Sequence, residues 1–410
     1  MATTDPSQEN WQSEALQDRG PTVLVIRAWL NPVGGAARIQ PAGFPEIGHV
    51  IYDAPRRDGS TEKVCIVDSA ASMANHLESV CLDGPNAGLH SDLAGIPYVR
   101  CVTDHSSVPE RDRQPGRVVT TSLTEGHRLA SDYFLDGQVD FGWKDQEAQN
   151  GPGTGATKEK KEKAKPAGWA GIAFRDRLRV EFGLQEVKKD EKYFIWPEAW
   201  WSIYKTIFKY DPNSLIHGVM FAKEQIKVSR MLTAHLEAFG AARVGRSGVK
   251  FDRLGKTTSG QPIFAVDEET AKTVVATFIL DLALLRSYGR GKDGLGEKQK
   301  RLLLDLAVWK IKRLLVSPFR YRTGCHLACG GVAWSDETAR LPEAPTVTDP
   351  SALRAIPVVT GVWDSPNVTD VYYPFAALFR LNNESGAAGR SSANTENARH
   401  EEDESEDEDE

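Results

Sequence analysis

Short apolar segments of strand length alternate along this chain with segments whose apolar residues recur at helical spacing. The β-branched run Thr22–Trp29 and the segment Lys63–Val67 predict strands, and Met73, Leu77 and Val80 predict a helix. A chain that interleaves such segments favours an α/β or α+β fold, in which helices pack on a sheet. With 410 residues, 40% of them hydrophobic, it is long enough to bury a sizeable core.

Two further segments, 174–182 and 319–323, alternate between apolar and basic residues. Strict alternation is typical of a strand with one buried and one exposed face, so each segment predicts a strand with a basic face. Those faces carry Arg175, Arg177, Arg179, Arg320 and Arg322.

Three longer apolar patterns complete the expected core. Residues 215–222 predict a buried strand, and residues 274–285 and 303–314 each carry an apolar stripe that predicts a helix. The longest apolar stretch, Thr273–Leu285, is interrupted by Asp281 and is shorter than the roughly 20 residues that a membrane helix needs. No secretory signal is visible at the N-terminus, and five scattered cysteines fit a reducing cytoplasm.

The net charge of −7 conceals an uneven distribution. Residues 391–410 contain ten acidic residues and one arginine, so residues 1–390 carry +2. Within them, residues 201–260 hold ten Lys and Arg against four Asp and Glu, and residues 281–330 hold eleven against four. Clustered positive charge predicts a site for a polyanion.

Several segments read as loops or loose ends. Residues 137–168 are rich in glycine and lysine and predict a flexible insertion, and residues 245–260 and 288–297 predict basic, glycine-rich loops. We expect residues 1–20 to be loose and residues 386–410 to form a disordered acidic tail. Such a tail could also cover a basic groove until a nucleic acid displaces it.

The common catalytic and metal-binding motifs are missing from the sequence. Cys325 and Cys329 have no second ligand pair nearby, so we expect free thiols and no metal or other cofactor. Basic strand faces, basic glycine-rich loops and aromatic side chains together predict a protein that binds single-stranded nucleic acid.

The order of several segments resembles one known family. These segments are GAARIQPAGFPEIG (35–48), VDSAASMANHLE (67–78), AGIPYV (94–99), TSLTEGHRLASDY (121–133), LIHGVMFAK (215–223), SGVKFDR (247–253), LDLALLRSYG (280–289) and FRYRTGC (319–325). Together they resemble the backbone subunit of type I-G (formerly I-U) CRISPR surveillance complexes, over roughly residues 22–335. That family belongs to the repeat-associated mysterious protein (RAMP) superfamily. The Lys-rich insertion and the acidic tail depart from its pattern.

The resemblance implies an RRM-like, ferredoxin-type core at residues 21–385, with finger and thumb insertions. It also implies that several copies line up along one CRISPR RNA (crRNA), contact other subunits of the complex, known as Cascade, and present the spacer for pairing with target DNA. Such a subunit grips RNA through phosphate and shape, because base pairing carries specificity. It needs no catalytic group and no membrane.

The helix signature S-x-x-N-[R/H]-x-E of the resemblance matches Ser72, Asn75, His76 and Glu78. From this match and from charge and spacing, we expect RNA contacts at Arg38, Asn75, His76, Arg128, Arg175, Arg177, Arg179, Arg246, Lys250, Arg253, Lys256, Arg286, Arg290, Lys292, Arg320 and Arg322.

Two other functions remain open at this point. One is a RAMP-type endoribonuclease that processes precursor crRNA, with His217 as the proton shuttle. The other is a general single-strand binding module without a defined assembly.

Overall fold

The structure is a computed structural model of the chain. The residues it describes are 11–44, 48–56, 58–83, 88–103, 117–139, 172–187, 192–195, 199–244, 268–289, 293–336, 343–353, 355, 357–363 and 368–373.

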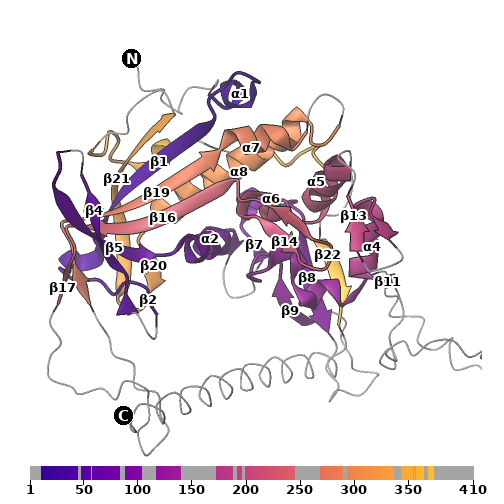
Figure 1. Cartoon of the computed structure of the whole chain (residues 1–410), viewed down its shortest axis with the longest axis horizontal. Coiled ribbons are helices and arrows are strands. Elements are labelled where there is room, and N and C mark those ends of the chain that lie inside the picture. The colour runs from indigo at the N-terminus through magenta and orange to yellow at the C-terminus, as the bar shows by residue number, and fades with distance from the viewer. Residues whose placement is uncertain are drawn as a thin grey trace, which may run out of the picture.

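A seven-stranded sheet, antiparallel throughout, crosses the larger part of the molecule (Figure 1). Its strands, in spatial order, are β20 (Phe319–Arg322), β21 (Cys325–Asp336), β1 (Val23–Pro32), β19 (Thr273–Asp281), β16 (Leu232–Phe239), β5 (Thr61–Asp68) and β4 (Ile51–Pro55). In the central pair, Ile26 of β1 lies opposite Phe278 of β19, and both side chains are fully buried. The core therefore runs through the middle of this sheet.

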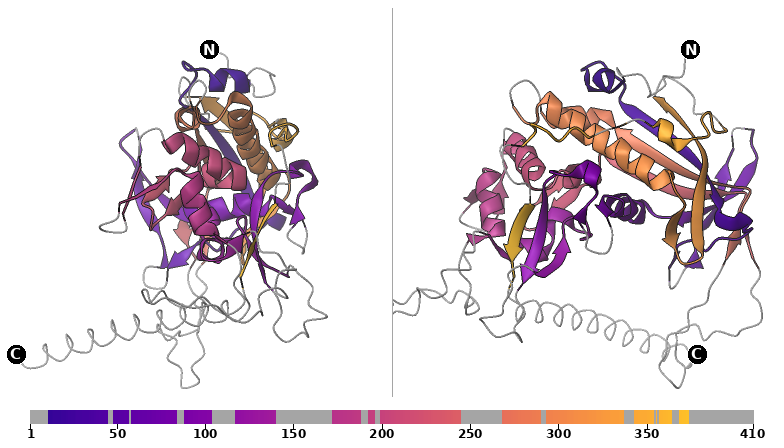
Figure 2. Two further views of the ribbon diagram at one scale, coloured as in Figure 1. Left: turned by 90° about the vertical axis from the view of Figure 1, so that its right-hand side faces the viewer. Right: turned by 180° about the vertical axis from the view of Figure 1, so that it is seen from behind.

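Four helices accompany the large sheet. They are α1 (Trp11–Leu16), α2 (Ala70–Ser79), α7 (Leu282–Ser287) and α8 (Glu297–Leu315). Helix α8 lies along the sheet, beside α2, α7 and α1, as the view from behind in Figure 2 shows. Met73 and Leu77 of α2 are buried on the side that packs against β16. One side of α2 therefore packs in the core, and the other side, with Asn75 and Ser79, is exposed.

A second, smaller sheet lies on the right-hand side of Figure 1, beyond α2 as seen from the large sheet. Its order is β11 (Ile172–Ala173), β10 (Gln138–Val139), β22 (Val368–Tyr372), β8 (Tyr98–Thr103) and β9 (Arg117–Thr121), and β22 runs parallel to β8. Near it lie α3 (Asp132–Leu135), α4 (Phe174–Glu181), α5 (Ala199–Tyr210), α6 (Asn213–His217) and the 3-10 turn η4 (Arg128–Ala130).

Short ribbons and turns complete the described elements. The ribbons are β2 (Gly43–Phe44) with β3 (Gly48–His49), β6 (Leu82–Asp83) with β7 (Gly88–Leu89), β12 (Gln185–Val187) with β13 (Lys192–Phe194), β14 (Val219–Phe221) with β15 (Ile226–Val228), and β17 (Ala242–Arg243) with β18 (Glu269–Thr270). Further 3-10 turns are η1 (Val33–Gly35), η2 (Ser91–Leu93) and η6 (Pro350–Ala352). The fold is mixed α+β, as expected from the sequence.

Five predicted elements are confirmed. The strand predictions at 22–29, 63–67 and 319–323 correspond to β1, β5 and β20, and the helix predictions at 72–80 and 303–314 correspond to α2 and α8. In each of these segments the spacing of the apolar residues fits one kind of element, and the boundary is marked in the sequence. Helix α2, for example, begins after Ser69, whose side chain accepts a hydrogen bond from the Ser72 N–H and caps the helix.

The strand prediction at residues 174–182 is wrong, because this segment forms the helix α4. Phe174, Leu178 and Phe182 are four residues apart and all buried, whereas Val180, which alternation places inside, is 79% exposed. A spacing of four follows one face of a helix, so the sequence fits both periods.

Two other predictions exchange strand and helix. Residues 273–281 form the strand β19, and the helix α7 begins only after Asp281, whose side chain accepts a hydrogen bond from the Leu284 N–H. The predicted strand at 215–222 is the end of α6 followed by β14, with Gly218 between them at a φ of 82°. Residues 273–281 have no exposed position and residues 215–222 have only two, so both a strand and a helix spacing fit their apolar residues.

Residues 11–16, within the segment expected to be loose, form α1 and bury Ala15. The predicted flexible insertion beyond residue 139, the basic loop at 245–260 and the acidic tail lie outside the described residues. Among the described residues, no helix is both long enough and apolar enough to cross a membrane.

Candidate nucleic-acid interface

The N-terminal end of α2 is organised by a buried carboxylate. Asp68, the last residue of β5, is 2% exposed and accepts hydrogen bonds from the Ser72 hydroxyl at 3.1 Å and the Ser69 N–H at 2.9 Å. His76 Nε2 lies 2.9 Å from the same carboxylate, and the Arg322 guanidinium pairs with it at 2.7 Å. We call Asp68, Ser72, His76 and Arg322 the Asp68 cluster.

Strand β20 supplies the aromatic wall of this cluster. The rings of Phe319 and Tyr321 meet the His76 ring edge-on, with centroids 5.3 and 5.4 Å away. Tyr321 is buried, so the contact fixes the orientation of the imidazole as well as its position. Two segments of the resemblance, at 67–78 and 319–325, therefore meet in space although about 240 residues separate them.

The pKa of Asp68 is set by opposing influences. Burial alone would raise it, but the His76 hydrogen bond, the Arg322 charge and the Ser72 hydroxyl together hold the pKa of Asp68 below its usual value. The ionised carboxylate is therefore the form that the folded protein favours.

This lowered pKa predicts an acid-sensitive contribution to stability. Because the folded pKa lies below the unfolded one, Asp68 stabilises the fold fully above about pH 4 and loses that contribution as pH falls through the folded pKa. We expect Asp68→Asn to be less stable than the wild type at pH 7, and the difference in urea midpoint to shrink between pH 4 and pH 2. Asp53→Asn, at an exposed carboxylate of β4, is the control. A difference that stays constant with pH would contradict the role given to the charge.

Two residues beside the Asp68 cluster are exposed. Asn75 points away from the apolar side of α2, and Arg320 lies on the open side of β20, where its guanidinium donates a 2.8 Å hydrogen bond to the Thr323 hydroxyl. No carboxylate among the described residues pairs with Arg320. A cation and an amide are thus presented next to a rigid support, an arrangement suited to phosphate and sugar oxygens.

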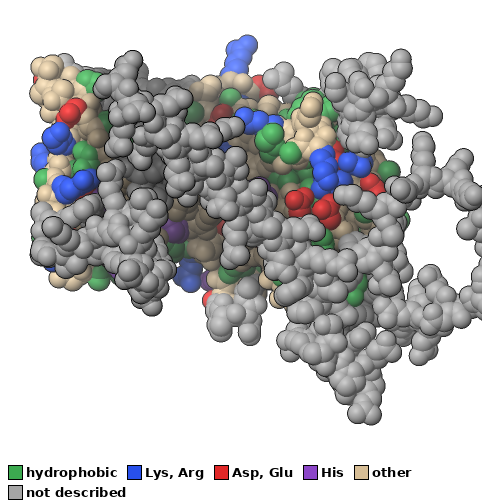
Figure 3. Space-filling model, turned by 60° about the horizontal axis from the view of Figure 1, so that its bottom comes forward, with side chains coloured by type: hydrophobic (Ala, Val, Ile, Leu, Met, Phe, Trp, Pro, Cys, Tyr) green, Lys and Arg blue, Asp and Glu red, His purple; other side chains and the backbone are tan. Residues whose placement is uncertain are grey.

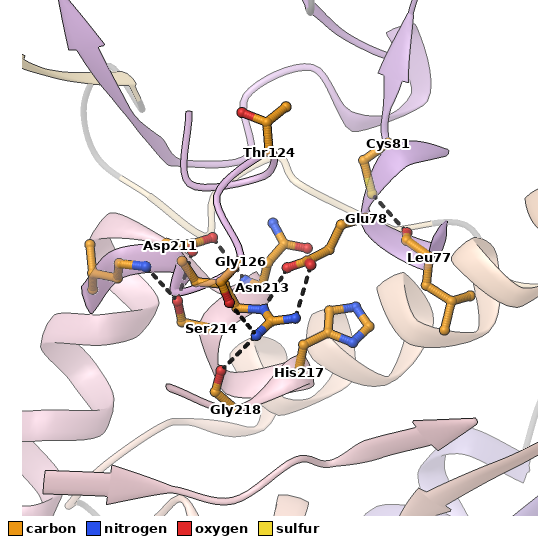
Figure 4. Close-up of polar contacts among 12 residues, drawn as sticks. Leu77, Glu78, Cys81, Thr124, Gly126, Asp211, Asn213, Ser214, His217 and Gly218 are labelled. Carbon is orange, nitrogen blue, oxygen red and sulfur yellow. Dashed lines mark hydrogen bonds and ion pairs between the residues drawn. The ribbon is translucent and has the colours of Figure 1, made fainter. Parts of the chain in front are cut away.

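The C-terminal half of the α2 signature anchors a second, buried cluster. Glu78 and Arg128 form a two-pronged ion pair at 2.7 and 2.9 Å, and both side chains are less than 10% exposed. Arg128 also donates to the carbonyls of Gly126 and Gly218 (Figure 4). This pair joins α2 to η4 and to the start of β14.

Lys310 of α8 lies in the same buried cluster. Its ammonium, fully buried, contacts Asn213 Oδ1 and lies 3.0 Å from His217 Nε2. Asp211 accepts hydrogen bonds from the Ser214 hydroxyl and the Asn213 N–H. We call Glu78, Arg128, Asp211, Asn213, His217 and Lys310 the buried polar cluster.

Burial dominates the pKa values in the buried polar cluster. It raises the pKa of Glu78 to about 7, against the opposing charges of Arg128 and Lys310, and it raises the pKa of Asp211. It holds the pKa of His217 well below its usual value, and the nearby charges of Lys310, Arg128 and Arg230 act in the same direction. His217 is therefore neutral at physiological pH.

The three arginines predicted on a basic strand face are instead ion-paired on α4. Arg175 is buried and faces Asp132 and Asp136 at 3.3 and 3.0 Å. Arg179 pairs with Glu224 at 2.8 Å, and Arg177 pairs with Glu181 at 3.2 Å. The contacts of Arg175 and Arg179 with Asp132, Asp136 and Glu224 fasten α4 to its neighbours, whereas the Arg177–Glu181 pair lies within the helix.

The remaining predicted RNA contacts divide into three groups. Arg38 is exposed and pairs with Glu268 at 2.8 Å. Arg286 donates to the carbonyls of Ala15, Pro21 and Gly20, so it fastens the N-terminal segment. The others lie outside the described residues and stay predictions: Arg246, Lys250, Arg253, Lys256, Arg290 and Lys292.

The structure thus brings His76 and Arg322 together at Asp68, with Asn75 and Arg320 beside them. Sequence reasoning missed Asp68, Asp211 and Lys310. Asp68 leaves a local signal, since an acidic residue that ends a strand and precedes a Ser N-cap can reach the first turn of the helix. Lys310 leaves none, because a lysine in an apolar helix stripe is ordinarily a surface residue.

The face shown in Figure 3 carries its Lys and Arg side chains in separate groups, and the group at its right-hand end adjoins Asp and Glu side chains. Within the described residues, no three His, Cys, Asp or Glu side chains lie close enough to hold a metal ion. All five cysteines have free thiols.

The chain was compared with models of known protein families. Residues 24–172 match the family model described as CRISPR-associated protein GSU0053 (Cas_GSU0053). The match indicates a relation to this CRISPR-associated family over 149 of the 410 residues, and it spans β5 and α2 entirely. A search of the curated proteins finds no match.

Proposed function

We propose that this chain is a crRNA-binding backbone subunit of a type I CRISPR surveillance complex of the I-G kind, in the cytoplasm. Copies of it assemble along one crRNA, contact the other Cascade subunits and present the spacer for pairing with target DNA. The subunit works without catalysis, because holding an RNA whose sequence varies requires contacts to phosphate and shape only.

The observation that carries this proposal is the placement of the α2 signature. Ser72 and His76 are held at Asp68, which Arg322 also contacts, Glu78 is buried against Arg128, and Asn75 is exposed. A helix that is held in place at both ends and exposes the side-chain amide of Asn75 to solvent is suited to positioning an RNA strand. The CRISPR-associated family match covers this helix.

The strand order supports an RRM-like core. Along the chain, β1, α2, β16, β19, α8 and β21 follow a β-α-β-β-α-β order, and in the sheet the four strands lie in the sequence β21-β1-β19-β16. Numbered within this unit, that is the order 4-1-3-2 with antiparallel neighbours. We propose that these six elements form the ferredoxin-type core, with β20, β5 and β4 as extensions of its sheet.

Replacing Arg320 by Ala tests the proposed interface. We expect the affinity for a fluorescein-labelled single-stranded RNA of 30 nucleotides to fall roughly tenfold at low salt, the effect of losing one charge-assisted hydrogen bond. The slope of log affinity against log salt should flatten by about 0.7, since one phosphate contact is lost.

Lys209→Ala is the matched control, because Lys209 is an exposed cation on α5 that already pairs with Glu181. Equal salt slopes for the wild type and Arg320→Ala would place the RNA elsewhere. Cleavage of the RNA by the purified wild type, abolished by His217→Gln, would instead favour an endoribonuclease.

A further inference from the structure

A cavity of about 510 Å³ lies between η4 and the β14–β15 hairpin. Its charged and titratable lining residues are His127, Arg128, His217, Lys227 and Arg230, and no Asp or Glu lines it. The cavity is therefore bordered by hydrogen-bond donors and positive charge, and its lining contains no carboxylate.

The hydrogen-bonding state of His217 follows from its buried neighbour. A lysine ammonium can only donate, so His217 Nε2, 3.0 Å from Lys310 Nζ, must accept. In the neutral ring the proton is then on Nδ1. Figure 4 shows His217 beside Glu78 and Gly218. Both His217 and Gly218 also line the cavity.

His217 Nδ1 has no hydrogen-bond partner among the described residues, although the side chain is only 1% exposed. A buried N–H donor without an acceptor costs about 1–3 kcal/mol, so native proteins rarely retain one without a reason. His217 is among the residues that line the cavity, so a ligand there can supply the missing acceptor once a small side-chain shift uncovers Nδ1.

The cavity also has cations that the fold does not neutralise. Arg230 is half-buried and Lys227 is exposed, and neither forms an ion pair with a described carboxylate. Arg128, by contrast, is neutralised by Glu78. Gly218 makes room for this arrangement, because a Cβ at its φ of 82° would lie 3.0 Å from Arg230 Cγ and from the Val228 carbonyl oxygen.

We propose that this cavity binds a phosphate group, with the His217 Nδ1–H donating to one phosphate oxygen and Arg230 and Lys227 neutralising the charge. A set of donors without a charged acceptor fits phosphate oxygens better than a nucleobase, whose edge presents donors as well. The phosphate belongs to the RNA backbone, and this assignment of its source rests on the proposed function. The site is separate from the Asp68 cluster.

Two charge-removing variants test the site with RNA. We expect Arg230→Gln and Lys227→Gln each to weaken binding of the 30-nucleotide RNA about tenfold and to flatten its salt slope by about 0.7. Lys223→Gln is the matched control, since Lys223 is exposed in the same hairpin but does not line the cavity. If all three variants bind RNA like the wild type, the cavity is not a phosphate site, although the proposed function stands.

An NMR measurement distinguishes binding of an RNA phosphate from binding of free inorganic phosphate. With ¹⁵N-histidine-labelled protein, the His217 signal, assigned by its loss in His217→Gln, should show the neutral Nδ1–H form and a downfield proton shift when RNA is added. A shift with inorganic phosphate in a protein that binds no RNA would support the cavity and overturn the proposed function. No shift with either probe would overturn the cavity proposal.

Discussion

Replacing Glu78 by Ala should lower the free energy of unfolding by about 3–5 kcal/mol, the cost of removing one partner from a buried ion pair. Arg128 would then keep its charge in a site where its side chain is only 7% exposed. The backbone of Arg128 also depends on its contacts. Its φ is 53°, a conformation that non-glycine residues hold only when surrounding contacts enforce it. Urea unfolding at pH 8, where Glu78 is ionised, measures the loss.

Ser79→Ala is the control for this experiment, since Ser79 lies on the same helix and is exposed. We expect it to change stability by less than about 0.5 kcal/mol, as surface substitutions usually do. A loss below about 1 kcal/mol in Glu78→Ala would mean that Arg128 finds another partner or reaches solvent, and that the pair does not hold α2 to η4.

Replacing Lys310 by Met should cost about 3 kcal/mol. Methionine fills a similar volume, so the loss comes from charge and hydrogen bonding and not from a cavity. Without the ammonium, Asn213 Oδ1 and His217 Nε2 lose their donor, and the buried acids Glu78 and Asp211 lose a positive neighbour.

Lys312→Met, two residues further along α8, is the matched control, because Lys312 is only half-buried. Combined with Glu78→Ala, Lys310→Met should cost less than the sum of the two single changes, since both act on one cluster of charges. Strict additivity of the urea results would contradict a shared cluster.

The sequence predicts an element correctly where the spacing of its apolar residues fits only a helix or only a strand. Helix α2 has a serine cap and an apolar stripe, and β1 is a β-branched run, so each is specified within about ten residues. Segment 174–182 has two compatible periods, and the choice between them is made by packing and by its ion pairs to Glu224, Asp132 and Asp136, which no local pattern contains.

The candidate site was predictable in its residue types but not in its partners. Asn75, His76, Arg320 and Arg322 are identified by the helix signature and by basic alternation. That His76 and Arg322 share Asp68 depends on β20 lying against α2, which follows from long-range sheet order. Likewise, Arg128 reads as an exposed cation until the fold places Glu78, 50 residues away, beside it.

The central claim is tested most directly by co-expressing the chain with a CRISPR array and purifying it through a high-salt wash. We predict a multi-subunit particle with a raised ratio of absorbance at 260 to 280 nm, and sequencing of the retained RNA should return discrete species derived from the array. A nucleic-acid-free monomer, or bound RNA drawn at random from the cell, would contradict the account of this chain as a crRNA-binding backbone subunit.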